Sequence, residues 1–89
     1  MKHCNLEVTY RKGRPIAAYF CLPRLEQDKS VRTEQVGGGL LVDFASDDRA
    51  IGIEISSPSL FSLSALNEVL VRLGLDPVRP DDVSPLAAA

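Results

Sequence analysis

The chain has 89 residues, of which 45% are hydrophobic and 25% charged, and this composition is that of a globular protein with room for one domain. Ten Lys and Arg residues against 12 Asp and Glu residues give a net charge of -2. This balance excludes a general nucleic-acid binder, whose affinity would depend on a basic surface. We therefore expect one domain over residues 1–89.

The two cysteines are too few for a disulfide scaffold, and no charged-then-apolar leader precedes them. No apolar run approaches the roughly 18 residues that would span a bilayer. These features predict a cytoplasmic protein that does not bind a membrane.

The charge is unevenly distributed along the chain. Residues 1–32 carry seven Lys or Arg against three Asp or Glu, whereas residues 33–89 carry three against nine. The two halves can complement each other within one sheet, or they can form a bipolar surface that favours pairing with a second copy or an acidic partner.

Five segments have the pattern of β-strands. Apolar and polar residues alternate in 6–10, 40–44 and 51–55, which is typical of strands with one buried face. Segment 31–36 is β-branched at both ends and polar between, which suits an edge strand. With segment 16–22, these form a predicted antiparallel meander of successive hairpins.

The register of the last predicted hairpin follows from placing the apolar residues of both strands on one face. The resulting pairs are Phe44 with Ile51, Val42 with Ile53, and Leu40 with Ile55. Asp47 and Asp48 then form a two-residue turn, in which both residues need a positive φ.

A helix is predicted over 62–74, and its apolar residues are Leu63, Leu66, Val69, Leu70 and Leu73. Either Ser62 or Ser64 can cap its start, and Gly74 suits the position after its end. Residues 75–89 are a short irregular tail, attached through Leu75, Val78, Val83 and Leu86. The fold class expected is α+β, with one helix packed on one face of the sheet.

Three parts of the chain together resemble the DUF2283 family, a group of small bacterial proteins classed as a domain of unknown function. They are segment 17–22, segment 31–36, and segment 41–44 followed by 51–55. The resemblance covers residues 6–57 and departs from the family pattern at Ile16 and Asp48. It implies a small antiparallel sheet module without an established activity, of which some relatives are encoded beside small toxin-like proteins.

Asp43 and Glu54 are the strongest candidates for chemistry, because the predicted register places them on one polar face, one diagonal step apart. Paired carboxylates can act as acid and base if burial or repulsion raises the pKa of one of them. The alternative is a solvated face, or ion pairs with Arg32 or Arg49.

Thr33 and Glu34 are expected near that same face, since the third strand is predicted to pair with the fourth. His3, Cys4 and Cys21 could converge on a zinc ion, but the usual Cys-x-x-Cys spacing is missing. The chain also lacks a second base for a nucleophilic triad. We therefore expect no catalytic residue, no cofactor and no metal.

The function that these observations favour is a non-catalytic interaction module that forms a homodimer, by edge pairing or by packing a face that holds Ala18, Phe20 and Leu41. An alternative is a role as an antitoxin-like protein that neutralises a small toxin-like partner through the acidic residues Asp43, Asp47, Asp48 and Glu54. A third is a small-molecule-binding protein or a carboxylate-based enzyme. The candidate interaction residues are Asp43, Glu54, Thr33, Glu34, Phe20 and Leu41.

Overall fold

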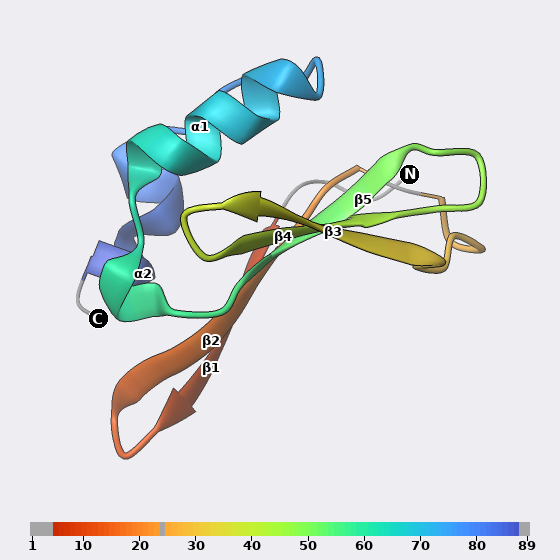
Figure 1. Ribbon diagram of the computed structural model, residues 1–89. Coiled ribbons are helices and arrows are strands. Elements are labelled where there is room, and N and C mark those ends of the chain that lie inside the picture. Colours follow the sequence, from red (N-terminus) through yellow and green to blue (C-terminus); the bar gives the residue numbers. More distant parts are fainter. Residues whose placement is uncertain (1–4, 24, 88–89) are drawn as a thin grey trace.

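The computed structural model describes residues 5–23 and 25–87, which form a five-stranded antiparallel sheet with helices on one side (Figure 1). The strands are β1 (Asn5–Arg11), β2 (Arg14–Cys21), β3 (Arg32–Gly37), β4 (Leu40–Phe44) and β5 (Ala50–Ile55). They are followed by the 3₁₀ turn η1 (Pro58–Leu60), the helix α1 (Leu63–Arg72), the 3₁₀ turn η2 (Pro80–Val83) and the short helix α2 (Ser84–Ala87). The predicted α+β class is confirmed.

The order of the strands is β1-β2-β5-β4-β3, so the predicted simple meander is wrong in one respect. β5 lies between β2 and β4, and the segment from Leu22 to Val31 carries the chain from β2 to the far edge. The burial of each strand explains this order. β5 contributes the fully buried Ile51, Ile53 and Ile55 and suits the centre, whereas β3 is exposed over most of its length and suits an edge.

Residues that face each other on neighbouring antiparallel strands point to the same side of the sheet. Two rows of such residues point toward the helices: Leu6, Phe20, Ile53, Val42 and Glu34 in one, and Val8, Ala18, Ile55, Leu40 and Gly37 in the other. Their central members form the core with Leu66, Val69 and Leu70 of α1. One face of the sheet is therefore covered by α1, as predicted.

The register of the β4–β5 hairpin is confirmed for Val42 with Ile53 and for Leu40 with Ile55. Phe44 is opposite Ala50 rather than Ile51, because the register shifts after Asp43. The turn is also longer than predicted. The Asp48 N–H donates to the Ala45 carbonyl and the Ala45 N–H to the Arg49 carbonyl, so residues 46–48 form a three-residue loop.

Within that loop, Asp48 has a φ of 69°, and it is the loop's single residue with a positive φ. This geometry is common for three-residue hairpin loops, in which the last loop residue is left-handed. The β1–β2 hairpin uses the tighter alternative, since Lys12 and Gly13 have φ values of 52° and 78°.

Local signals place both ends of α1. The Ser62 hydroxyl accepts a hydrogen bond from the Ala65 N–H, so Ser62 is the N-cap and Ser64 is not. At the other end Gly74 has a φ of 77°, and the Leu75 N–H donates back to the Leu70 carbonyl. This pair of features is the Schellman motif, for which glycine is the preferred residue.

The tail is attached to the core as predicted. Val83 and Leu86 are buried, and Leu75 and Val78 pack against the same cluster. The side chain of Asn67 in α1 brackets the backbone of Val78, because its amide donates to the Val78 carbonyl at 3.1 Å and accepts from the Val78 N–H at 2.8 Å. No helix within the described part of the chain has the length and apolar character needed to cross a membrane.

Candidate interaction face

The side of the sheet away from α1 is here called the open face. The pairings between strands place on it Glu7, Thr9, Ala17, Tyr19, Cys21, Thr33, Gln35, Leu41, Asp43, Gly52 and Glu54. In Figure 1 the helices gather on the other side of the sheet. The core residues of α1 therefore pack against the opposite face of the sheet and do not cover the open face.

A ladder of side chains crosses the open face from β2 to β3. The Tyr19 hydroxyl donates to Asp43 Oδ2 at 2.8 Å, and the Thr33 hydroxyl donates to Asp43 Oδ1 at 2.6 Å. Since β5 separates β2 from β4, the tyrosine has to reach over β5 to make this bond. Both oxygens of Asp43 are thus held by neutral donors on two other strands.

Gly52 makes this reach possible. It is buried in β5, directly opposite Asp43, and a Cβ atom built on it would lie 2.0 Å from the Tyr19 hydroxyl oxygen and 2.2 Å from the carbon that bears it. The tyrosine ring therefore lies against the backbone of Gly52. A glycine inside a strand often marks such a close approach.

The charged residues of the open face are all acidic. They are Glu7 on β1, Asp43 on β4 and Glu54 on β5. Glu54 is opposite Tyr19 on one side and Leu41 on the other, and Glu7 accepts a hydrogen bond from the Cys21 thiol at 3.2 Å. The face therefore combines carboxylates with the half-buried side chains of Leu41, Ala17 and Tyr19, a surface that suits contact with a basic or amphipathic partner.

The structure brings together four of the six predicted interaction residues. Asp43, Glu54, Thr33 and Leu41 lie on the open face, and the diagonal relation of Asp43 to Glu54 is as predicted. The partners of Asp43 differ from those expected, because its carboxylate accepts hydrogen bonds from the hydroxyl groups of Tyr19 and Thr33 and not from Arg32 or Arg49.

Three residues expected on this face, Phe20, Ala18 and Glu34, do not lie on it. Phe20 is 3% exposed and Ala18 is 4% exposed, and both lie in the core against α1, so neither can pack with Leu41 against a partner. Glu34 is opposite Val42 and therefore points to the helix side, where it pairs with Arg32. Successive side chains of a strand point to opposite faces, so Thr33 and Glu34 cannot share one surface.

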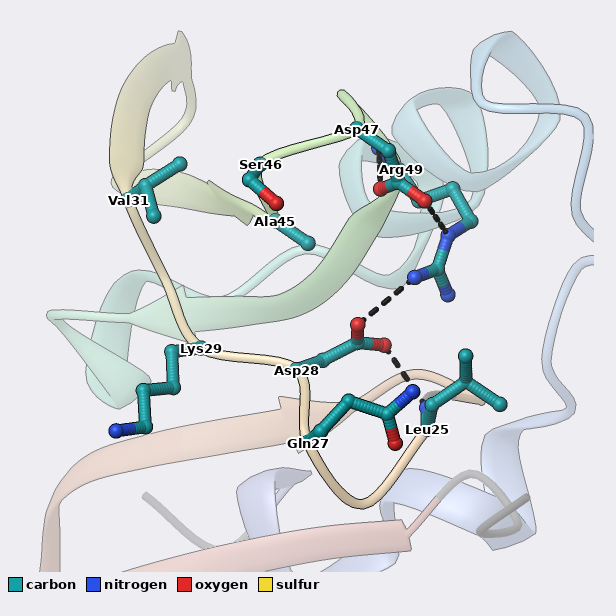
Figure 2. A pocket seen from close by; sticks show the side chains of 9 residues that line it. All are labelled: Leu25, Gln27, Asp28, Lys29, Val31, Ala45, Ser46, Asp47 and Arg49. Carbon is teal, nitrogen blue, oxygen red and sulfur yellow. Dashed lines mark hydrogen bonds and ion pairs between the residues drawn. The ribbon is translucent and has the colours of Figure 1, made fainter.

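A second polar cluster lies at the end of the sheet, where the 22–31 segment meets the β4–β5 loop. It lines an open pocket of about 450 Å³, formed by Leu25, Gln27, Asp28, Lys29, Val31, Ala45, Ser46, Asp47 and Arg49. Figure 2 shows Arg49 between the carboxylates of Asp28 and Asp47. The guanidinium is thus engaged by two acids of the same chain, and this favours a structural role.

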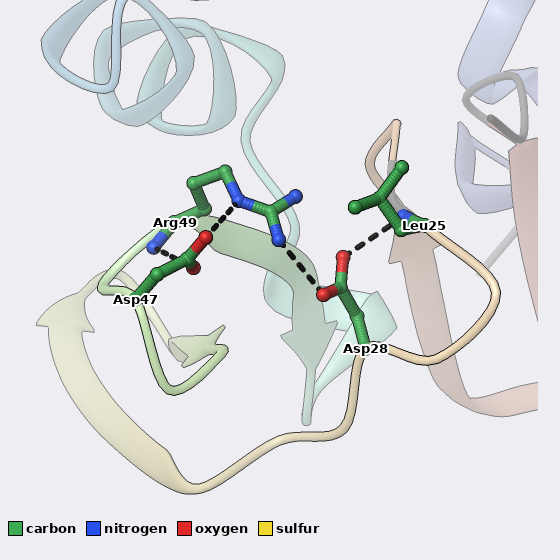
Figure 3. A network of polar contacts seen from close by, with 4 residues as sticks. All are labelled: Leu25, Asp28, Asp47 and Arg49. Atoms are coloured by element: carbon green, nitrogen blue, oxygen red, sulfur yellow. Dashed lines mark hydrogen bonds and ion pairs between the residues drawn. The ribbon is translucent and has the colours of Figure 1, made fainter.

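The contacts of Arg49 join two segments that are distant in the sequence (Figure 3). Its Nη2 donates to Asp28 Oδ1 at 2.8 Å and its Nε donates to Asp47 Oδ2 at 2.6 Å. Asp28, whose side chain is 8% exposed, also accepts from the Leu25 N–H at 2.8 Å. Arg49 therefore fastens the crossing segment to the β4–β5 loop.

Hydrogen bonds within this network shift the pKa of two of these groups. The hydrogen bond from Arg49 lowers the pKa of Asp47 below its ordinary value of 3.8. The pKa of Arg49 is raised, first by its hydrogen bond to Asp28 and then by that to Asp47. Both shifts favour the ionised network at neutral pH.

Sequence reasoning missed Tyr19, Gly52 and the contact of Arg49 with Asp28. The glycine inside the alternating segment 51–55 was a usable signal, because it breaks a run of isoleucine and glutamate side chains and leaves space for a neighbour. The Arg49–Asp28 pair spans 21 residues and carried no local signal.

Among the described residues, no group of three or more His, Cys, Asp and Glu side chains could hold a metal ion. The suggested zinc ligands His3 and Cys4 lie outside the described residues. Comparison of the chain with protein-family models, with curated proteins and with solved structures finds no match.

Proposed function

We propose that this protein is a non-catalytic interaction module that associates with a second copy of itself. The observation that carries the proposal is the one-sided cover of the sheet: α1 packs on one face, while none of the residues that the structure describes adds a further layer to the open face or a further strand to the edges β1 and β3. Within the described chain, β1 and β3 each pair with one strand, so each has a row of backbone groups directed outward.

The small size of the chain supports the same proposal. A domain of 89 residues buries a smaller share of its surface than a larger one, and association with a second copy adds to that share. Closed two-fold dimers are the commonest form of such association. A cytoplasmic location stays a proposal, which the small number of cysteines in the sequence supports. Membership of the DUF2283 family stays a proposal that rests on the resembling segments.

Sedimentation velocity over a range of protein concentrations tests the proposal. We expect a species of twice the 9.7 kDa chain mass that dissociates on dilution. A single species of 9.7 kDa at every concentration, including the highest that stays soluble, would contradict it.

A second candidate function, the binding of a small basic protein, is favoured by the charge of the open face. Glu7, Asp43 and Glu54 give this face one sign, and complementary charge steers and selects partners. Co-expression with the product of the neighbouring gene, followed by purification, tests it. We expect a complex that is lost in Glu54→Lys and retained in Glu68→Lys, an equal charge change on the exposed side of α1. Purification of the homodimer alone would contradict this second candidate.

A further inference from the structure

We propose that the association occurs along β3, whose edge pairs antiparallel with β3 of a second copy so that Arg32 of each copy lies opposite Glu34 of the other. This inference rests on the proposed self-association and adds the surface and the register. It joins the two sheets side by side into one continuous sheet, with both open faces on the same side.

One backbone hydrogen bond next to β4 shows which N–H and C=O groups of β4 point to β5 and which point to β3. Ser56 follows Ile55, Gly39 precedes Leu40, and the Ser56 N–H donates to the Gly39 carbonyl. Gly39 and Ser56 face each other and form a hydrogen-bonded pair. Because hydrogen-bonded and non-hydrogen-bonded pairs alternate along antiparallel strands, the next pair, Leu40 with Ile55, is a non-hydrogen-bonded pair. The N–H and C=O of Leu40 therefore point to β3 and, by alternation, so do those of Val42.

The same alternation fixes the free side of β3. Glu34 is opposite Val42, so these two residues form a hydrogen-bonded pair and the backbone groups of Glu34 point to β4. The backbone N–H and C=O groups of Thr33 and Gln35 therefore point away from the sheet, to the open edge. The register is regular from Arg32 to Gln35, so these four residues offer a template for another strand.

The side chains select one register among those that a two-fold axis allows. With Thr33 opposite Thr33 of the second copy, both residues form a hydrogen-bonded pair, and Arg32 lies opposite Glu34 in two symmetric pairs without backbone bonds between them. Pairs of that kind have the closest side chains. Opposite charges directly across strands stabilise a sheet, and Thr–Thr pairs do so as well.

The neighbouring registers are unfavourable. A shift that centres the axis on Glu34 brings the two Glu34 side chains together, and a shift that centres it on Arg32 brings the two guanidinium groups together. Like charges directly opposite destabilise a strand pair. The exposed residues of β3 are therefore self-complementary: Arg32 matches Glu34 of the second copy, as a two-fold interface requires.

The side chains of the other edge are less suited to a two-fold pairing. Both edge strands have one register shift, between Thr9 and Tyr10 in β1 and between Gln35 and Gly37 in β3, so the shifts do not distinguish them. The regular part of β1, residues 5–9, has Glu7 as its one charged side chain and offers no cation to face it. Val31, the residue before β3, is 64% exposed, and pairing along β3 would place it beside Gln35 of the second copy and reduce that exposure. These features favour β3 over β1.

Charge reversal at the two positions tests the inference. Arg32→Glu and Glu34→Arg should each weaken dimerisation about tenfold or more, because each creates two like-charge pairs. The double variant Arg32→Glu/Glu34→Arg restores opposite charges and should recover the dimer. Arg72→Glu, an equal reversal on the exposed part of α1, is the matched control and should leave the dissociation constant unchanged.

The measured dissociation constants distinguish a failure of pairing along β3 from a failure of self-association itself. Circular dichroism confirms that each variant is folded, and sedimentation then gives its dissociation constant. A wild-type dimer whose dissociation constant is unaffected by either single reversal overturns pairing along β3 and leaves self-association intact. A double variant no tighter than the single variants also overturns the register. A monomeric wild-type protein overturns both proposals.

Discussion

Gly52 is a position where the sheet has no room for a side chain. A Cβ atom there would lie 2.0 Å from the Tyr19 hydroxyl oxygen, so Gly52→Ala must displace the ring and break its bond to Asp43. We expect a loss of about 1–3 kcal/mol in the free energy of unfolding, which is the usual cost of overpacking.

A double-mutant cycle identifies the cause of that loss. In a Tyr19→Ala background the space over residue 52 is empty, so Gly52→Ala should be neutral or slightly stabilising, because alanine is less costly to order in a strand than glycine. Chemical denaturation of the four proteins measures the coupling. An equal loss in both backgrounds would show that the ring is not the obstacle.

Asp48 occupies a conformation that glycine adopts more readily. Its φ of 69° is unfavourable for most residues, and its ion pair with Arg32 is largely exposed and contributes little. Asp48→Gly should therefore raise the free energy of unfolding by a few tenths to about 1 kcal/mol. Asp48→Asn, which removes the charge but keeps a side chain that tolerates this conformation, should have a smaller effect. A lower melting temperature for Asp48→Gly would contradict the geometry of the loop.

The ionisation of Asp47 links the loop to pH. Because its pKa in the folded protein is below the ordinary value of 3.8, the folded state binds this proton less tightly than the unfolded chain does. The stability that Asp47 contributes is therefore fully present above pH 3.8, and it is lost as the pH falls through the pKa of Asp47 in the folded protein. Carboxyl NMR titration should find this low pKa in the wild type and a pKa near 3.8 in Arg49→Gln. An equal pKa in both proteins would exclude Arg49 as the cause.

The tail depends on one side chain of α1. Asn67→Ala removes both hydrogen bonds to Val78 and leaves its backbone groups without those partners, which should cost about 1–3 kcal/mol. We expect faster proteolysis within residues 75–87 and faster amide exchange at Val78. Ser64→Ala, at an exposed position of the same helix, is the control. Unchanged protection of Val78 in Asn67→Ala would show that the buried Val83 and Leu86 hold the tail without it.

Local patterns predicted the elements well and their spatial neighbours less well. The alternation of Leu40, Val42 and Phe44 and the Ser62 and Gly74 caps are short-range signals, and they gave the strands, the helix and most of one register correctly. The register shift after Asp43 and the contact of Arg49 with Asp28 depend on partners brought close by the fold.

At the level of the whole molecule, the position of β5 between β2 and β4 was not predictable from sequential hairpins alone. It changes the candidate site, because the ladder from Tyr19 to Asp43 requires an intervening strand with a glycine. The alternation of polar and apolar residues predicted the face that carries Asp43 and Glu54. It did not predict which face α1 covers in β2, and this decides the burial of Phe20.

In the proposed dimer a second copy pairs along β3. Amide hydrogen exchange of Thr33 and Gln35, measured at a high and a low protein concentration, tests this pairing most directly, with Arg32 and Glu34 as internal references because their amides point to β4. We expect slow exchange at Thr33 and Gln35 at high concentration and fast exchange after dilution, while the references stay slow at both. Fast exchange of Thr33 and Gln35 at both concentrations would contradict it.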